Sequence, residues 1–203
     1  MKVGPENPQA TTDSDQLFVR RPSAQTALLS ALMLLAFAIT AFLFGSSPVL
    51  SGDHIWITLF LAAALITLTA IDLDRYLLPD WLTLPLIILG LGYSYIFGVG
   101  IILSGLGAAL GYVIIASIAY FWRSQMGREG IGLGDAKLLA AAGAWLGALS
   151  LPALLLGASG LGLVFFAVLS ISKKYSEIRQ VLPFGPFISL AFWTLWCAPR
   201  ISV

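Results

Sequence analysis

Two aspartates border apolar runs, and their residue type and position make them the first candidates for chemistry. Asp72 follows the apolar run 55–71, within Ala70-Ile71-Asp72-Leu73-Asp74. Asp135 precedes the run that starts at residue 136, within Gly132-Leu133-Gly134-Asp135-Ala136-Lys137. An ionisable group at the edge of the hydrocarbon phase is costly and tends to be retained for function. The two carboxyl groups are therefore candidate active-site residues.

Two carboxyl groups brought together at a low-dielectric edge do not both ionise readily, so they share one proton. Such a pair suits peptide hydrolysis. The ionised member takes a proton from water as the water attacks the carbonyl carbon, and the protonated member donates to the developing oxyanion. The residues alone leave plainer interpretations open: Asp135 is well placed to cap the helix that follows it, and Asp72 could simply mark the membrane boundary.

Seven apolar runs must position these side chains. Two long stretches exceed the roughly 20 residues that cross a bilayer core, so we expect each to fold back, one at Gly98-Val99-Gly100 and one near Ser150-Leu151-Pro152. The expected spans are residues 27–45, 55–71, 82–97 and 101–122, two within 136–171, and 184–198. The sequence therefore predicts an all-α transmembrane bundle of about seven spans over residues 27–203. A flexible, retained polar tail precedes it at residues 1–26.

The composition supports a membrane protein and excludes several kinds of site. Of the 203 residues, 59% are hydrophobic and 10% are charged, and the mean hydropathy is +0.93. A soluble domain carries about 25% charged residues, so the expected surroundings are a lipid bilayer. The net charge of +1 argues against a nucleic-acid partner. One cysteine and one histidine exclude an internal disulfide, a thiolate cluster and a multi-histidine metal site.

Small residues gather in two of the later runs. They form Gly105-Leu106-Gly107-Ala108 and Gly157-Ala158-Ser159-Gly160. Glycine and alanine let transmembrane backbones approach closely, so we expect these faces to be helix–helix contacts. For any single glycine, the ordinary composition of a membrane helix explains the residue equally well.

The charges segregate on the seven-span arrangement. Nine of the ten acidic residues and ten of the eleven basic residues fall on one side, and Arg200 is the basic exception. The basic residues on the crowded side are Lys2, Arg20, Arg21, Arg75, Arg123, Arg128, Lys137, Lys173, Lys174 and Arg179. The positive-inside rule makes that side cytoplasmic, so the N-terminus is expected inside and the C-terminus outside.

Three motifs closely resemble those of the type IV prepilin peptidases. Residues 71–85, Ile-Asp-Leu-Asp-Arg-Tyr-Leu-Leu-Pro-Asp-Trp-Leu-Thr-Leu-Pro, resemble that family's first active-site segment. Residues 132–138, Gly-Leu-Gly-Asp-Ala-Lys-Leu, match its second, the GxGD element that presenilin-like proteases also carry. Residues 183–187, Pro-Phe-Gly-Pro-Phe, resemble its C-terminal PFGP element. The motifs occur in the family's order and in matching positions relative to the spans.

The resemblance implies that Asp72 and Asp135 are a catalytic dyad in an intramembrane aspartyl endopeptidase. It implies cleavage of prepilin or pseudopilin precursors after the glycine that ends a short basic leader, at the cytoplasmic face of a bacterial inner membrane. It implies no metal and no other cofactor. Many members carry a cytoplasmic methyltransferase insert with paired CxxC motifs. This sequence has no CxxC and is similar to the short, peptidase-only members, including those of tight-adherence pilus systems.

Residues beside the two aspartates are candidate supporting or substrate-binding groups. Gly132 and Gly134 are expected to let the backbone approach a substrate strand and orient Asp135. Asp74 is expected to be solvated or to tune Asp72. Asp80, which follows Pro79, is expected to cap a helix. Lys137 either lowers the pKa of Asp135 or is an ordinary interfacial lysine.

The PFGP segment supplies the last candidates, Pro183, Gly185 and Pro186. One interpretation is a plain helix start. The other is an extended strand that hydrogen-bonds an unwound substrate.

Three other functions remain open at this point, one of them a purely structural subunit of a pilus machine. A preflagellin peptidase would share the two-aspartate arrangement. A proton-coupled transporter would use the aspartates as a relay, but such groups usually lie near the midplane, in broken helices within repeats. Here they lie at one edge, and no internal repeat is evident.

Overall fold

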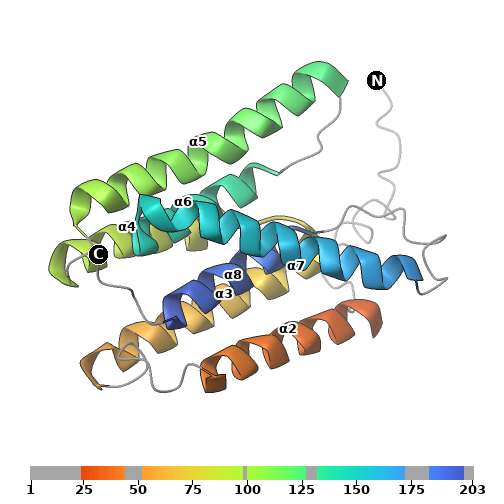
Figure 1. Cartoon of the computed structure of the whole chain (residues 1–203), viewed down its shortest axis with the longest axis horizontal. Coiled ribbons are helices and arrows are strands. Elements are labelled where there is room, and N and C mark those ends of the chain that lie inside the picture. Colours follow the sequence, from red (N-terminus) through yellow and green to blue (C-terminus); the bar gives the residue numbers. More distant parts are fainter. Residues whose placement is uncertain (1–23, 44–51, 98–99, 127–131, 172–182, 199–203) are drawn as a thin grey trace, which may run out of the picture.

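The computed structural model describes residues 24–43, 52–97, 100–126, 132–171 and 183–198, and all secondary structure in these ranges is helical. Consecutive helices alternate in direction, as Figure 1 shows. The seven α-helices of the described ranges are α2 (Ala24–Leu43), α3 (Ile55–Arg75), α4 (Asp80–Phe97), α5 (Ile101–Met126), α6 (Leu133–Leu146), α7 (Leu151–Ile171) and α8 (Gly185–Cys197). The predicted all-α bundle is confirmed. The predicted tail lies mostly outside the described residues.

Four of the helices, α3, α4, α5 and α7, are long and apolar enough to cross a membrane. Their outer faces are also apolar: Leu156, Leu163 and Val164 of α7 are 75%, 69% and 64% exposed. Outward-facing leucine and valine along whole helices suit lipid rather than water. The chain is a multi-pass membrane protein. Arg75, Arg123 and Lys137 lie at or near the helix ends on one side, as predicted.

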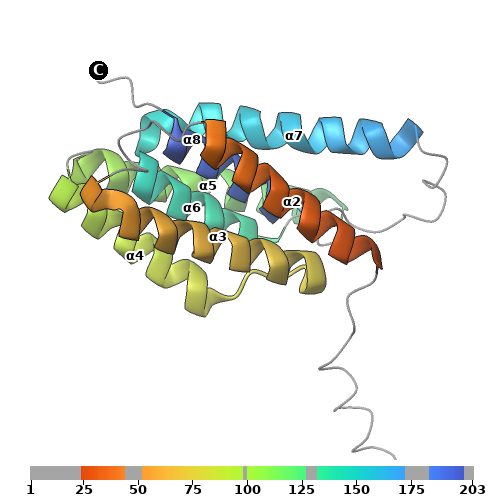
Figure 2. The same ribbon diagram turned by 90° about the horizontal axis from the view of Figure 1, so that it is seen from below.

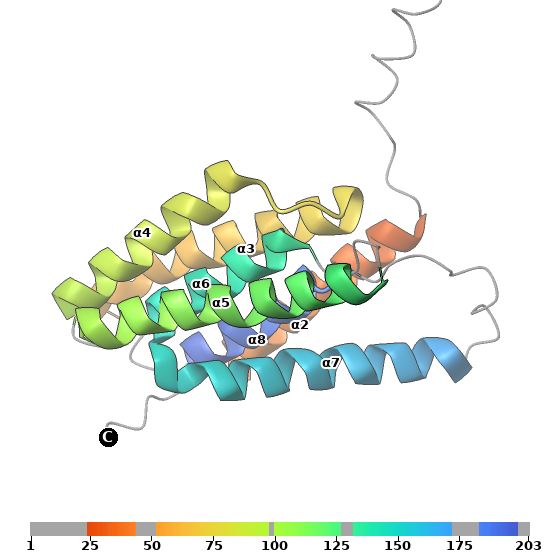
Figure 3. The ribbon, with the colours of Figure 1, turned by 90° about the horizontal axis from the view of Figure 1, so that it is seen from above.

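Helix α6 is the core of the bundle. Every residue from Leu138 to Trp145 is buried, and α6 packs against α4, α5 and α8. Figure 3 shows α4 and α5 side by side with α6 behind them, and Figure 2 shows α2 lying against α3 and α8. A helix of 14 residues spans about 21 Å. At this length α6 alone would be too short to cross the hydrocarbon core, and the neighbouring helices enclose it.

Glycines bring α5 and α6 into backbone contact. A Cβ at Gly107 or Gly143 would collide with the backbone of the other helix, and one at Gly111 would lie 2.6 Å from the Leu139 carbonyl oxygen. The predicted packing role is confirmed for Gly107. It is wrong for Gly105 and Gly160, which have open space beside them.

Both predicted reversals are confirmed. Helix α4 ends at Phe97 and α5 begins at Ile101, just after Gly100, whose φ of 88° suits glycine. Helix α6 ends at Leu146, Gly147 follows with φ 85°, and a short 3-10 helix, Ala148–Ser150, leads into α7.

Indole N–H groups tie the helices together inside the bundle. Trp145 of α6 donates to the Leu86 carbonyl oxygen of α4 at 2.8 Å, and Gly90 leaves room for its ring. Trp193 of α8 donates to the Phe37 carbonyl oxygen of α2 at 3.2 Å. A buried N–H must find a partner where water is excluded, so these bonds fix how the helices are rotated.

Candidate active site

Asp72 lies in the last turn of α3, at the end of the bundle where α4, α6 and α8 begin (Figure 1). The run that contains it was expected to end at residue 71, but the helix continues to Arg75. Tyr76 then adopts the left-handed conformation, with φ 54°, and its N–H donates to the Asp72 carbonyl oxygen at 2.9 Å. The Asp72 side chain is only 5% exposed. It therefore lies within the bundle rather than at an open boundary.

Asp135 lies in the first turn of α6 and is partly buried. The capping interpretation is wrong, because Gly132 occupies the N-cap position and the Asp135 N–H donates to the Gly132 carbonyl oxygen at 3.2 Å. The carboxyl groups of Asp72 and Asp135 are close enough to repel each other electrostatically. Two helices that are far apart in sequence thus bring two acidic groups together at one end of the bundle.

Gly185, the first residue of α8, lies directly against the Asp72 side chain. A Cβ at position 185 would be 2.5 Å from Oδ2 and 3.0 Å from Cγ of Asp72. The backbone N–H of Gly185 interacts favourably with the carboxylate, and Oδ2 itself has no hydrogen-bond partner among the described residues. Only a glycine at position 185 leaves room for the Asp72 carboxyl group where it lies.

The segment 183–186 begins a helix. Phe184 has φ −90° and ψ −23°, α8 starts at Gly185, and Pro186 occupies its first turn. The alternative of an extended strand that binds substrate is wrong for this structure. Pro183 precedes the helix and is partly buried, whereas Pro186 is buried. Proline fits the first turn because its missing N–H would have no partner there.

A second contact joins the start of α4 to the start of α6. The Lys137 ammonium pairs with Oδ1 of Asp80 at 2.5 Å. The capping interpretation of Asp80 is wrong, because α4 already begins at Asp80, and the N–H of Thr83 bonds to the Pro79 carbonyl oxygen at 3.2 Å. Lys137 thus pairs with Asp80, and its partly exposed side chain still fits the interfacial alternative.

Gly134 completes this contact. A Cβ at position 134 would lie 2.9 Å from Cβ of Leu78, in the loop between α3 and α4. Gly134 thus allows the loop after Asp72 to pack on the turn that carries Asp135. Leu78 was not predicted from the sequence, although it lies one residue before Pro79 within the first motif.

Two predicted residues lie outside this cluster. Asp74 is exposed at the end of α3, in agreement with the solvated alternative, and Gly132 is exposed before α6. A Cβ at Gly132 would meet only the Gly134 nitrogen, at 3.9 Å, so packing does not require a glycine there. Within the described residues, no group of three or more His, Cys, Asp or Glu side chains could hold a metal ion.

Comparison with known proteins gives consistent results. Residues 59–167, more than half of the chain, match the model of the type IV leader peptidase family. A prepilin leader peptidase/N-methyltransferase from Aeromonas salmonicida is 42% identical over 141 residues, which are 68% of this chain and 48% of that protein. Proteins of the same name from Aeromonas hydrophila and Neisseria gonorrhoeae are 39% and 37% identical, over 83% and 87% of this chain and 56% and 58% of their own. The chain spans about half the length of these relatives, and no solved structure matches it significantly.

Proposed function

The chain belongs to the type IV leader peptidase family, and we propose that it is an intramembrane aspartyl endopeptidase that removes the leader of prepilin-like precursors. The observation that carries this proposal is the approach of Asp72 and Asp135 from α3 and α6 at one end of the bundle. The relatives are prepilin leader peptidase/N-methyltransferases, which supplies the substrate class. The proposal for this chain concerns the peptidase activity alone.

The two carboxyl groups divide the chemistry between them. One carboxylate accepts a proton from a water molecule while the water oxygen bonds to the scissile carbonyl carbon. The other carboxyl group donates its proton to the carbonyl oxygen, which gives a tetrahedral intermediate. The intermediate collapses as the C–N bond breaks. The new amine takes a proton from the carboxyl group that was charged at the start, and one hydroxyl group of the intermediate returns its proton to the other carboxylate as the new carbonyl forms. The pair thereby returns to its original state of one shared proton.

The surroundings of the pair suit this chemistry. Gly185 packs directly against the Asp72 carboxyl group and leaves no room for it to move toward α8. The Asp80–Lys137 pair and the contact between Gly134 and Leu78 hold the α3–α4 loop on the first turn of α6. Fixing both carboxyl groups on packed helices reduces the reorganisation that the reaction requires.

We place the aspartate pair at the cytoplasmic face of a bacterial inner membrane, with the N-terminus inside. The segregation of basic residues in the sequence supports this orientation, and Arg75, Arg123 and Lys137 lie at or near the aspartate end of the helices. The apolar helix of a precursor would lie against the bundle within the bilayer, and its basic leader would reach the cytoplasmic end.

The direct test is cleavage by the purified protein in lipid nanodiscs. A prepilin-like precursor from the same genome is incubated with the protein, and the product is analysed by N-terminal sequencing. We expect a single new N-terminus immediately after the glycine that ends the leader. If neither prepilin-like nor preflagellin precursors are cleaved, the peptidase proposal is wrong. Cleavage of preflagellin alone would assign the substrate to the other class.

A further inference from the structure

The buried polar side chains of this bundle fall into two groups. Among the residues that the structure describes, seven polar or charged side chains are buried: Thr58, Thr69, Asp72, Thr83, Ser94, Ser104 and Ser189. Four of them have hydrogen bonds. Ser104 donates to Ser94, Ser94 donates to the Ala144 carbonyl oxygen, Thr58 accepts from Trp196, and Thr83 donates to the Pro79 carbonyl oxygen. The other three, Thr69, Asp72 and Ser189, each have a buried oxygen without a hydrogen-bond partner in the described part of the chain.

These three side chains lie in one region of the fold. Thr69 precedes Asp72 by three residues on α3, and Ser189 follows Gly185 by four residues on α8. Because Gly185 contacts Asp72 and the two helices run in opposite directions, Thr69 and Ser189 both lie about one turn deeper in the bundle, roughly 5 Å below Asp72. At the far end, Trp196 of α8 bonds to Thr58 of α3 at 3.2 Å, so the same pairing continues along both helices.

The two hydroxyl groups also differ from others on the same helices. Thr67 of α3 and Thr194 of α8 each donate to the carbonyl oxygen four residues earlier, at 2.7 Å. This is the usual way in which a membrane helix satisfies a hydroxyl group. Thr69 and Ser189 make no such bond. Their hydroxyl groups therefore remain available to a ligand inside the bundle.

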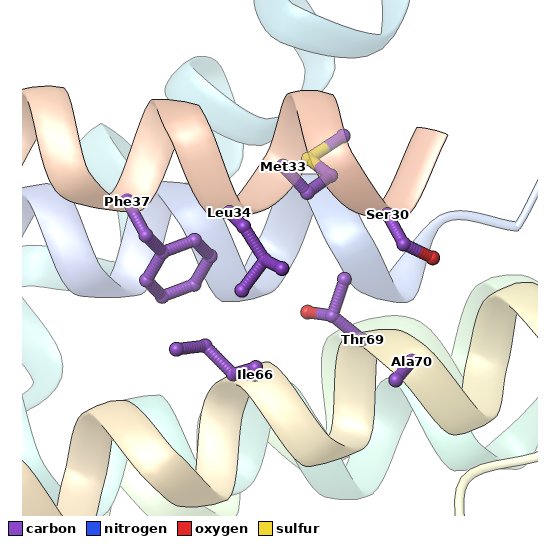
Figure 4. A pocket seen from close by; sticks show the side chains of 7 residues that line it. All are labelled: Ser30, Met33, Leu34, Phe37, Ile66, Thr69 and Ala70. Carbon is purple, nitrogen blue, oxygen red and sulfur yellow. The ribbon is translucent and has the colours of Figure 1, made fainter. Parts of the chain in front are cut away.

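There is space beside one of them. A pocket lies between α2 and α3, and apart from Ser30 and Thr69 its lining is apolar. Figure 4 shows the Thr69 side chain in the gap between these helices, with its methyl group toward α2 and its hydroxyl oxygen on the side of Leu34 and Ile66. Ser189 lies four residues after Gly185, which contacts Asp72 of α3, and four before Trp193, which bonds to Phe37 of α2, so it shares the face of α8 that meets these two helices.

We propose that Thr69, Ser189 and Oδ2 of Asp72 form an internal hydration site, which holds water one helical turn behind the aspartate pair. Buried polar groups in native proteins are nearly always satisfied, and a water molecule needs two to four polar partners, which these three oxygens provide. Water bound there hydrogen-bonds Asp72 and supplies the hydrolytic water from within the bundle. Its role in hydrolysis rests on the proposed peptidase function, whereas the hydration itself does not.

The hydration is tested without any substrate by X-ray radiolysis of the protein in nanodiscs, followed by mass spectrometry. Hydroxyl radicals formed from bound water label the side chains beside it. Leu68 and Ile188 are fully buried neighbours of the site, and Leu154 of α7 is a fully buried control. We expect labelling of Leu68 and Ile188 at least threefold above Leu154, and loss of this excess in the Thr69→Val/Ser189→Ala double variant. Labelling equal to that of Leu154 in the wild type would overturn the proposal.

The contribution to hydrolysis is tested by cleavage kinetics. We expect kcat to fall at least tenfold in the double variant with KM unchanged, and Thr69→Ser to retain most activity. The matched controls are Thr67→Val and Thr194→Val, whose hydroxyl groups bond to their own helices, and both should keep the wild-type kcat. An unchanged kcat in the double variant refutes the role in hydrolysis even if the labelling is lost. If the wild type cleaves no precursor, the function fails, but the labelling still decides the hydration.

Discussion

Substituting Gly185 by alanine should impair activity while leaving the fold intact. The added Cβ would lie 2.5 Å from Oδ2 of Asp72. Ordinary contacts begin at 3.4 Å, so the carboxyl group must move by about 0.9 Å. Misplacing a reacting group by about 1 Å can cost about 100-fold in rate, which corresponds to about 2.7 kcal/mol in the activation free energy. The φ of Gly185 is not positive, so alanine meets no backbone strain there.

The assay compares kcat for precursor cleavage and thermal unfolding in nanodiscs. We expect Gly185→Ala to lower kcat by about 100-fold and to change the free energy of unfolding by less than about 1 kcal/mol, since alanine also favours the helix. Gly162→Ala is the matched control, because its Cβ would meet Phe187 at an ordinary 3.8 Å. A Gly185→Ala enzyme with wild-type kcat would refute the argument that this glycine positions Asp72.

Three further predictions concern the packing around the pair. Asp80→Lys and Lys137→Asp should each lower kcat several-fold, and the charge-swapped double variant should recover it. Asp80 is 59% exposed and Lys137 is 24% exposed, so the pair contributes only about 0.2–1 kcal/mol to stability. Unchanged kcat in both single variants would exclude a role of the pair in positioning the aspartates. Gly143→Val should destabilise the fold by about 3 kcal/mol or prevent folding, because its side chain would enter the α5 backbone. Gly105→Val should leave the stability unchanged, because Gly105 faces open space. If both variants lost the same stability, this packing would be contradicted. Trp145→Phe should cost about 1 kcal/mol in an unfolding titration through the lost hydrogen bond to α4, and an unchanged midpoint would be inconsistent with that bond.

The sequence predicted the helices well because lipid imposes a simple constraint on them. A backbone in hydrocarbon must satisfy its hydrogen bonds internally, so each apolar run of sufficient length becomes a helix. The run 82–97 agrees with α4 to within two residues, and the reversals at Gly100 and near Ser150 follow from turn-forming residues. The prediction for the run 55–71 was wrong at its C-terminal end. The helix continues through Asp72 and ends only where Tyr76 caps it, four residues later.

The contacts between helices were not predictable in the same way. Lipid-facing and core-facing positions are both apolar, so the sequence does not show how each helix is rotated. Gly185 and Asp72 are 113 residues apart, and only the packing of α8 on α3 reveals their contact. Asp80 was expected to cap α4, but the nearby Lys137 ammonium offers the carboxylate a charged partner instead.

The central claim is that Asp72 and Asp135 act together in hydrolysis. The most direct test measures cleavage of a prepilin-like precursor by wild type, Asp72→Asn and Asp135→Asn, with Asp74→Asn as an exposed carboxyl control. All four proteins must first be shown to be folded and membrane-inserted. Loss of activity by at least about 100-fold in each of the first two variants, with the third near wild type, is the expected result. Near-normal cleavage by either Asp72→Asn or Asp135→Asn would contradict the two-aspartate mechanism.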